Sequence, residues 1–243
     1  MDAVAHRVKR VASGWETQLT VAVDGVISRV TVFELCEAFY ALNPPAGPPT
    51  RLRLRSEVLA GSWEALTRGL ADLSIGCASE AGVPGDICSL PLGEIDFVFA
   101  VAPHHPLAAA TEPLSDADML SHRAIAVADS AQRMAPMSVN LLPGQDVLTV
   151  ATVPAKIEAH LRGLGCGFLA EPMIREHVRA GQLVVREVQR RRASVRLSYA
   201  WRSPRTDEGR QAPHGLALAW WLEQLESPAT RRALLERHAG LII

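Results

Sequence analysis

The segment Trp63–Gly76 constrains the fold of this chain more than any other part of the sequence. Its first half, up to Arg68, has the composition of a helix, and Gly69 follows where helices commonly end in a left-handed residue. Its second half is an apolar strand that begins with the acidic Asp72, and we expect this strand to stop at Gly76. A helix that leads directly into a buried strand is half of a β-α-β unit. The segment therefore predicts an α/β fold.

The same alternation of strands and helices continues on both sides of that segment. Before it, Val32, Leu35 and Phe39 follow the i, i+3, i+7 spacing of one buried helix face. After it, the apolar strand Phe97–Val101 runs into a proline-bounded turn. The other predicted strands are 19–23, 52–54, 124–127, 147–150, 168–170, 183–185 and 195–201. The other predicted helices are 2–13, one that begins at Ser115, 154–162, one that begins at Pro172, and 216–226.

Two such β/α sets, joined by two chain crossings, predict a bilobed molecule. We expect the crossings near 98–101 and near 198–200, and parallel strands with covering helices in each lobe. The expected division is a short helix remnant at 1–14, a first subdomain at 15–98 and 201–243, and a second subdomain at 99–200.

The charge and the cysteine content restrict the classes of protein to consider. The formal net charge of −1 gives no electrostatic reason to bind a polyanion, and the only compact basic run, 190–192, is typical of an exposed loop. Four cysteines without a CxxC pair favour a reduced, cytoplasmic setting. Residues 1–14 lack the apolar core of a signal peptide, and no apolar run approaches the ~20 residues that span a bilayer. We therefore expect a protein that is neither exported nor embedded in a membrane.

No sequence motif for catalysis, metal binding or cofactor binding is present. The glycine-rich run Gly163–Gly167 follows a helix and precedes a strand, which is the reverse of a dinucleotide-binding loop, and we interpret it as a helix end. His104, His105 and His160 have no partner at the spacing of a zinc site, and GxSxG, HExxH and P-loop patterns are missing. The sequence therefore predicts no catalytic residue, no metal ligand and no cofactor.

What remains is a binding function, and its expected place is the carboxyl ends of the strands. In open α/β sheets ligands bind there, where helix N-termini point free N–H groups at them. Ser28, Ser130 and Thr152 suit a carboxylate or similar anion, although each also suits a plain helix cap. Asp24 and Glu57 add negative charge, which instead favours a ligand with an amine or hydroxyls. The predicted ligand-binding residues are Asp24, Ile27, Ser28, Glu57, Val58, Ala128, Ser130, Thr152, Val153, Pro154 and Ala170.

Several segments, in their order and spacing, carry a family resemblance. They are Trp15–Asp24, Glu57–Leu66, Ala71–Gly76, His105-Pro106-Leu107-Ala108, Gly163–Pro172 and Gly181–Val184. Together they resemble the effector-binding domain of LysR-type transcriptional regulators over nearly the whole chain from Trp15 onward. The resemblance implies the bilobed fold of type 2 periplasmic binding proteins, with two α/β subdomains joined by two crossover strands. It also implies a small-molecule effector, such as a small organic acid or an aromatic compound, and a homodimer or tetramer.

Two departures from the family pattern affect what the resemblance implies. The family's Leu-Pro pair is here Leu169-Ala170-Glu171-Pro172, which puts a carboxylate at the rim of the cleft. The winged helix-turn-helix of these regulators is absent from the sequence, and Val4, Val8 and Val11 resemble only the tail of the linker helix. DNA binding is therefore implied for a parent protein, through an N-terminal domain that this sequence does not include.

Two other functions are compatible with the same fold. A solute-binding protein would share it, but the expected lack of an export signal and the unpaired cysteines argue against that class. An enzyme acting on small acids would need an inward-facing acid/base pair, for which Glu57 and Glu171 are the candidates. Two helix faces are candidates for core and dimer contacts, with the core expected to take most of them: Val32/Leu35/Phe39 and Val153/Ile157/Leu161.

Overall fold

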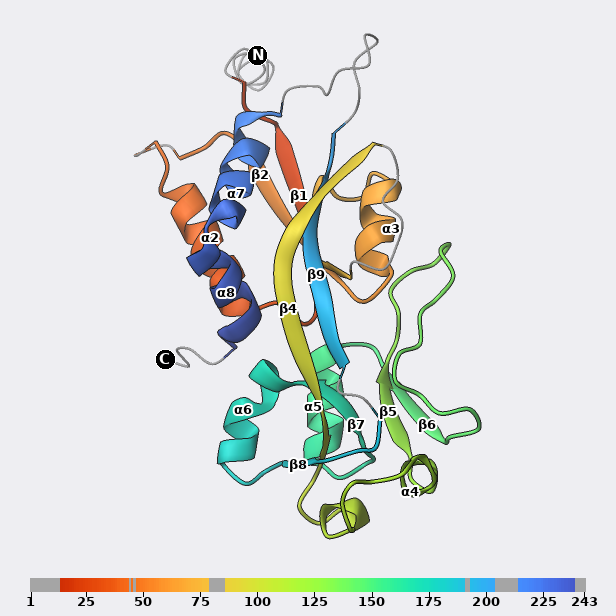
Figure 1. Ribbon diagram of the computed structural model, residues 1–243. Coiled ribbons are helices and arrows are strands. Elements are labelled where there is room, and N and C mark those ends of the chain that lie inside the picture. The colour runs from red at the N-terminus through yellow and green to blue at the C-terminus, as the bar shows by residue number, and fades with distance from the viewer. Residues whose placement is uncertain are drawn as a thin grey trace.

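The computed structural model describes residues 14–43, 45, 47–78, 86–190, 193–203 and 214–238, which form two lobes along one long, curled sheet (Figure 1). Lobe I is built on β1 (Gln18–Asp24), β2 (Arg51–Glu57), β3 (Leu73–Ala78), α2 (Arg29–Tyr40), α3 (Gly61–Thr67), α7 (Leu216–Glu226) and α8 (Pro228–Glu236). Lobe II is built on η1 (Pro106–Ala108), α4 (Asp116–Leu120), β5 (Ala124–Val127), β6 (Val147–Val150), α5 (Val153–Leu161), β7 (Gly167–Ala170), α6 (Glu171–Arg179) and β8 (Val184–Arg186). The predicted helix at 2–13 and the loop residues 44, 46, 191 and 192 lie outside the described residues.

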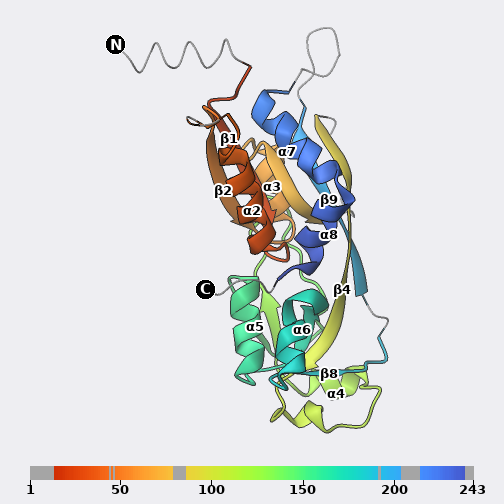
Figure 2. The ribbon, with the colours of Figure 1, turned by 90° about the vertical axis from the view of Figure 1, so that its left-hand side faces the viewer.

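Two long strands, β4 (Ile87–Val101) and β9 (Ala193–Arg202), run through both lobes (Figure 2). β9 pairs antiparallel with β3 in lobe I and with β4 along its length, and β4 then pairs with β7 and β8 in lobe II. The sheet order is β2-β1-β3-β9-β4-β7, with β8 also on β4. The two predicted crossover strands are therefore confirmed. Their residue boundaries between subdomains stay a prediction, because both strands belong to both lobes.

The sheet is mixed, so the expectation of parallel strands was correct only away from the crossovers. β1 runs parallel to β2 and β3, and β5 runs parallel to β6 in a small second sheet. β4 and β9 are antiparallel to each other because one carries the chain out of lobe I and the other brings it back. Each of these two strands therefore runs antiparallel to the strands beside it.

Helices α2, α7 and α8 cover one face of the sheet in lobe I, and α3 lies on the other side (Figure 1). The predicted face of α2 is buried, with Phe39 at its centre. Phe39 meets Trp220 of α7 edge-on with ring centroids 5.3 Å apart, and the neighbouring Trp221 is fully buried. The core therefore takes this apolar face, as the sequence analysis expected.

Helix α8 was not anticipated from the sequence. It begins directly after α7, with the Ser227 hydroxyl accepting a hydrogen bond from the Thr230 N–H. Of its nine residues only Leu234 and Leu235 are buried, so its apolar signal is too short to give a helical periodicity. The helix matters for the molecule because its end packs on α2 and closes lobe I toward lobe II.

In lobe II the predicted elements are confirmed with few shifts. β5 and β6 have the expected bounds, and α4 begins with the expected capping box between Ser115 and Asp118. Val153 and Ile157 of α5 are buried, and Leu161 packs partly buried against the same cluster. The helix ends predicted at Gly69 and Gly163 are confirmed as well, since both glycines follow a helix with positive φ.

Strand β3 does not end at Gly76 as expected. It continues to Ala78 through a β-bulge at Gly76, whose φ of +99° favours glycine. A Cβ atom built on Gly76 would lie 2.8 Å from the Cβ of Asp24. The missing side chain therefore lets the end of β1 approach β3, and this close approach helps to bury Asp24.

Candidate functional site

The candidate site lies where lobe I faces lobe II, at the carboxyl ends of β1 and β2. Asp24 is the last residue of β1 and Glu57 the last residue of β2, and the two are direct partners in the parallel ladder. Both side chains are buried. Their neighbouring positions follow from strand geometry, because parallel strands end at the same edge of a sheet. The prediction that strand ends bring these two carboxyl groups together agrees with this geometry.

The Asp24 side chain stabilises both the turn that follows β1 and the turn that follows β2. Its carboxylate accepts hydrogen bonds from the Val26 N–H (3.0 Å), the Leu59 N–H (3.0 Å) and the Ser62 hydroxyl (3.4 Å). Leu59 adopts φ +55°, a strained conformation for a leucine, which turns its N–H toward Asp24. Burial raises the pKa of Asp24 to about 7, these hydrogen bonds lower it in part, and the charge of Asp129 raises it further.

The opposite wall comes from the connection between β5 and β6 in lobe II. We call residues Asp129–Met137 the arm; this segment crosses from lobe II to α3 of lobe I (Figure 1). Ser130 reaches the end of β2, where its hydroxyl donates to Glu57 Oε2 (2.7 Å) and accepts from the Val58 N–H (2.9 Å). The Ser130 N–H donates to the Val58 carbonyl (3.2 Å). Ser130 therefore joins the two lobes directly at the predicted site.

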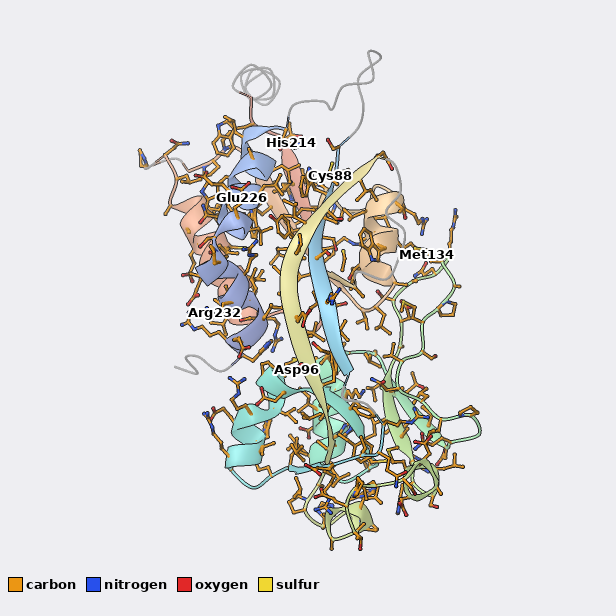
Figure 3. The ribbon with its side chains drawn as sticks, viewed as in Figure 1. Cys88, Asp96, Met134, His214, Glu226 and Arg232 are labelled. Carbon is orange, nitrogen blue, oxygen red and sulfur yellow. The ribbon has the colours of Figure 1, made fainter. Side chains whose placement is uncertain are left out.

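Two further carboxylates complete the contact between the arm and α3. Asp129 accepts hydrogen bonds from the N–H groups of Ala60 (3.3 Å) and Gly61 (3.2 Å) at the start of α3. In the other direction Glu64 of α3 accepts from three successive arm N–H groups, those of Gln132 (3.0 Å), Arg133 (2.8 Å) and Met134 (2.8 Å). Figure 3 labels Met134 beside α3. The N–H groups of Met134 and Arg133 lower the pKa of Glu64 to about 2.

A second contact between the lobes lies at the start of α5. Thr152 caps this helix by accepting from the Ala155 N–H (3.2 Å), and Pro154 occupies its first turn. A Cβ atom on Gly25 would lie 2.8 Å from Val153 Cγ2, so the turn after β1 touches the first turn of α5. This places three more of the predicted ligand-binding residues, Thr152, Val153 and Pro154, where the two lobes meet.

The other four predicted residues have structural roles on either side of this contact. Ser28 caps α2 by accepting from the Thr31 N–H (3.2 Å), and its hydroxyl donates to the Arg237 carbonyl. Ile27 of lobe I and Ala170, the last residue of β7 in lobe II, are buried in the same core cluster. Ala128 lies at the base of the arm, where its N–H donates to the Val150 carbonyl (2.8 Å). The role of all predicted residues in ligand binding stays a prediction.

Asp129 and Glu64, which hold the two walls together, were not predicted from the sequence, and neither was Ser62, which bonds Asp24 within lobe I. The signal that was present is the length of the connection from Ala128 to Asp146, which has no helix or strand of its own. Loops of such length inside compact domains are usually functional. Residue type alone did not single out Glu64, because a glutamate on a helix most often faces solvent.

The residues considered for other chemistry have structural partners. Glu171 forms an ion pair with Arg175 (2.5 Å), and Arg175 also pairs with Glu236 of α8 (3.0 Å). Glu57 pairs with Arg55 (2.9 Å). His105 caps η1 by accepting from the Leu107 N–H (3.2 Å). Within the described ranges no group of three or more His, Cys, Asp or Glu residues is arranged to hold a metal ion.

Cavities and helix lengths add two observations. A cavity of about 240 Å³ lies in lobe II between β4, β7 and residues 185–188, and none of the predicted ligand-binding residues lines it. Among the residues that the structure describes, no helix is both long and apolar enough to cross a membrane.

Comparisons with known proteins assign the family. The family model described as the LysR substrate binding domain matches residues 12–229. The chain is 34% identical over 216 residues to the uncharacterized HTH-type transcriptional regulator YeeY of Escherichia coli K12. The aligned region covers 89% of this chain and 66% of that protein. The chain therefore spans slightly less than two thirds of the length of this relative.

Solved structures agree on the fold. The regulatory domain of MetR from N. meningitidis aligns with a TM-score of 0.63 at 20% identity and covers 90% of this chain and 94% of its own. Full-length LysG from Corynebacterium glutamicum with bound effector Arg aligns with a TM-score of 0.62 at 18% identity. This alignment covers 92% of this chain and 71% of the LysG chain. The predicted fold, that of the type 2 periplasmic binding proteins, is confirmed. The chain belongs to the LysR family of transcriptional regulators and carries the substrate-binding domain of that family.

Proposed function

We propose that this domain binds a small-molecule effector between its two lobes and thereby controls transcription through the full-length regulator. The observation that carries the proposal is the convergence of Asp24 and Glu57 from lobe I with Ser130 from lobe II in one hydrogen-bonded cluster. A ligand that replaces these inter-lobe contacts would interact with both lobes at once. The proposed binding residues around this cluster are Val58, Ala128, Thr152, Val153 and Pro154, with Ile27, Ser28 and Ala170 in the supporting walls.

The charge of the site favours one kind of effector. Asp24, Glu57 and Asp129 place three carboxyl groups around the crevice, and Arg55 is the cation that pairs with Glu57. A simple organic acid would add another negative charge there. We propose instead a ligand that carries an amine or several hydroxyls, which donate hydrogen bonds to carboxylates. The structure of LysG with bound Arg is compatible with this choice, at the level of the shared fold.

The mechanism would be a shift between two arrangements of the lobes. An effector can favour one arrangement only through a difference in its affinity for the two. In a homodimer or tetramer, such a change in one domain would alter the geometry of the assembly. DNA binding would be performed by an N-terminal domain of the helix-turn-helix kind, which the name of the YeeY relative contains.

A thermal-shift and calorimetry screen tests the proposal. The panel pairs basic amino acids and polyols with simple organic and aromatic acids at equal concentration. A ligand at 100 times its Kd stabilises by about 2.7 kcal/mol, which raises the Tm of a domain of this size by roughly 5–10 °C. We expect this shift from an amine or polyhydroxy compound. The absence of saturable binding across the whole panel would contradict the proposal.

A matched pair of variants locates the binding. Glu57→Gln removes the charge at the proposed site, and Glu158→Gln removes the charge of a glutamate that is also paired with an arginine but is exposed on α5. We expect Glu57→Gln to weaken binding of the identified ligand by roughly tenfold or more, because hydrogen bonds to a charged group contribute about 1.5–3 kcal/mol. Glu158→Gln should bind as the wild type does. Equal affinities of both variants would place the ligand elsewhere.

A further inference from the structure

We infer that the arm Asp129–Met137 is an internal latch that holds the two lobes together without any ligand. The inference concerns the unliganded domain, so it does not depend on the identity or existence of an effector. Its basis is the reciprocal contact between the arm and α3. Asp129 of the arm accepts two N–H groups of lobe I, and Glu64 of lobe I accepts three N–H groups of the arm.

Both sides of the contact supply acceptors for backbone N–H groups that lie outside regular helix or strand ladders. The N–H groups of Ala60 and Gly61 belong to the start of α3, where a helix leaves its first donors without an intrahelical partner. The Gly61 N–H is shared between Asp129 and the Val58 carbonyl (3.1 Å). The N–H groups of residues 132–134 belong to a segment without helix or strand. Each side therefore supplies acceptors to the other, and separation would return the N–H groups of Ala60 and of residues 132–134 to water.

The contact at Gly61 is also specific in shape. A Cβ atom built on this glycine would overlap the Ser130 hydroxyl and would lie 2.9 Å from the Ser130 Cβ. Ser130 therefore occupies the space that a side chain on α3 would fill. Its N–H and hydroxyl are fixed at the same time by Val58 and Glu57. The arm is seated at a specific place on lobe I and does not merely pass over it.

The arm can leave lobe I without exposing much apolar surface. The side chains from Gln132 to Pro136 are exposed, so the arm buries little apolar surface against lobe I. It is held by hydrogen bonds to charged groups, and water can replace these when the arm leaves. The end of β2, which carries Glu57 and Val58, lies directly under Ser130. Release of the arm would therefore uncover the floor of the crevice.

Hydrogen exchange with mass spectrometry on the unliganded wild-type chain provides the first test. The N–H groups of residues 60–61 and 132–134 should exchange much more slowly than expected for a loop. Gly61→Ala adds the Cβ that clashes with Ser130, and the helical backbone at residue 61 accepts alanine. In this variant both segments should exchange roughly tenfold faster or more, while α2 and α7 keep their protection. Small-angle X-ray scattering should show an increased radius of gyration.

Asp129→Ala repeats the test from the arm, where it also removes the acceptor of the Ala131 and Met137 N–H groups. It does not alter lobe I, which covers the case that Gly61→Ala fails to fold. Asp146→Ala is its matched control, because Asp146 lies in the same connection but pairs only with the exposed Arg123. The inference predicts faster exchange and an increased radius of gyration for Asp129→Ala alone. It is overturned if the wild-type arm exchanges as an open loop. It is also overturned if the arm is released and the radius of gyration stays that of the wild type.

Discussion

Asp24 should make the stability of this domain depend on pH in a way that an exposed aspartate would not. Burial is the main cause of its raised pKa, which moves from 3.8 to about 7. Between these two values the folded protein binds a proton that the unfolded chain does not, so stability decreases as the pH rises through this range. The loss is complete above pH 7, where the folded protein holds a buried carboxylate beside Asp129.

The substitution Asp24→Asn removes this titration. Comparison with the wild type therefore measures what the titration contributes to the free energy of unfolding. A pKa difference of about three units corresponds to about 4 kcal/mol when fully developed, and to about 2–3 kcal/mol between pH 5 and pH 8. The amide cannot accept hydrogen bonds from both the Val26 and the Leu59 N–H, which costs about 1–3 kcal/mol at every pH. The variant should therefore be less stable than the wild type at pH 5, and the difference should shift by about 2–3 kcal/mol in its favour by pH 8.

Urea unfolding at pH 5, 6, 7 and 8 measures this difference, with equal m-values as the check that both proteins unfold alike. Subtracting the two proteins cancels the titration of all groups outside the site. Asp146→Asn is the control, because its carboxylate is 64% exposed and pairs with Arg123 away from the site. A constant difference between Asp24→Asn and the wild type from pH 5 to pH 8 would refute the reasoning.

Three further predictions concern the core, a buried histidine and a helix cap. Trp221→Ala should destabilise the domain by about 3–5 kcal/mol, measured by urea unfolding, because Trp221 is fully buried. Burial lowers the pKa of His160 to about 4, so its contribution to stability is lost as the pH falls below 6.5. Between pH 7 and pH 5 the free energy of unfolding of His160→Gln should therefore fall by about 2 kcal/mol less than that of the wild type, in the same assay. Ser28→Ala should lower the free energy of unfolding by about 1–3 kcal/mol, because it removes the cap of α2 and the bond to Arg237.

The elements that were predicted correctly are those with a local signal. α2 was predictable because Val32, Leu35 and Phe39 repeat at helical spacing and all three are buried. α8 was not, because its two buried leucines are adjacent and give no repeat. The bulge at Gly76 also escaped prediction, since its cause is the close approach of Asp24 from another strand. Contacts of this kind are set by the tertiary structure and have no pattern in the local sequence.

The residues of the candidate site likewise include some that a local sequence signal predicted and others that it did not. Asp24 and Glu57 were predictable as neighbours, because each ends a strand and parallel strands end together. The partners Asp129 and Glu64 were not, because the arm has neither periodicity nor regular structure. The sequence also suggested an open crevice, whereas Ser130 meets Glu57 and the turn at Gly25 meets Val153. Only the folded arrangement of the arm reveals that these walls are in direct contact.

The central claim, that an effector binds between the lobes, is tested most directly by nuclear magnetic resonance. Amide signals of the isotope-labelled chain would be followed while the ligand found in the screen is added. We expect saturable shifts to concentrate at Gly25, Val58, Ser130 and Val153, which come from both lobes. Shifts confined to the lobe II cavity around Phe99 and Phe168, with the crevice signals unchanged, would contradict it.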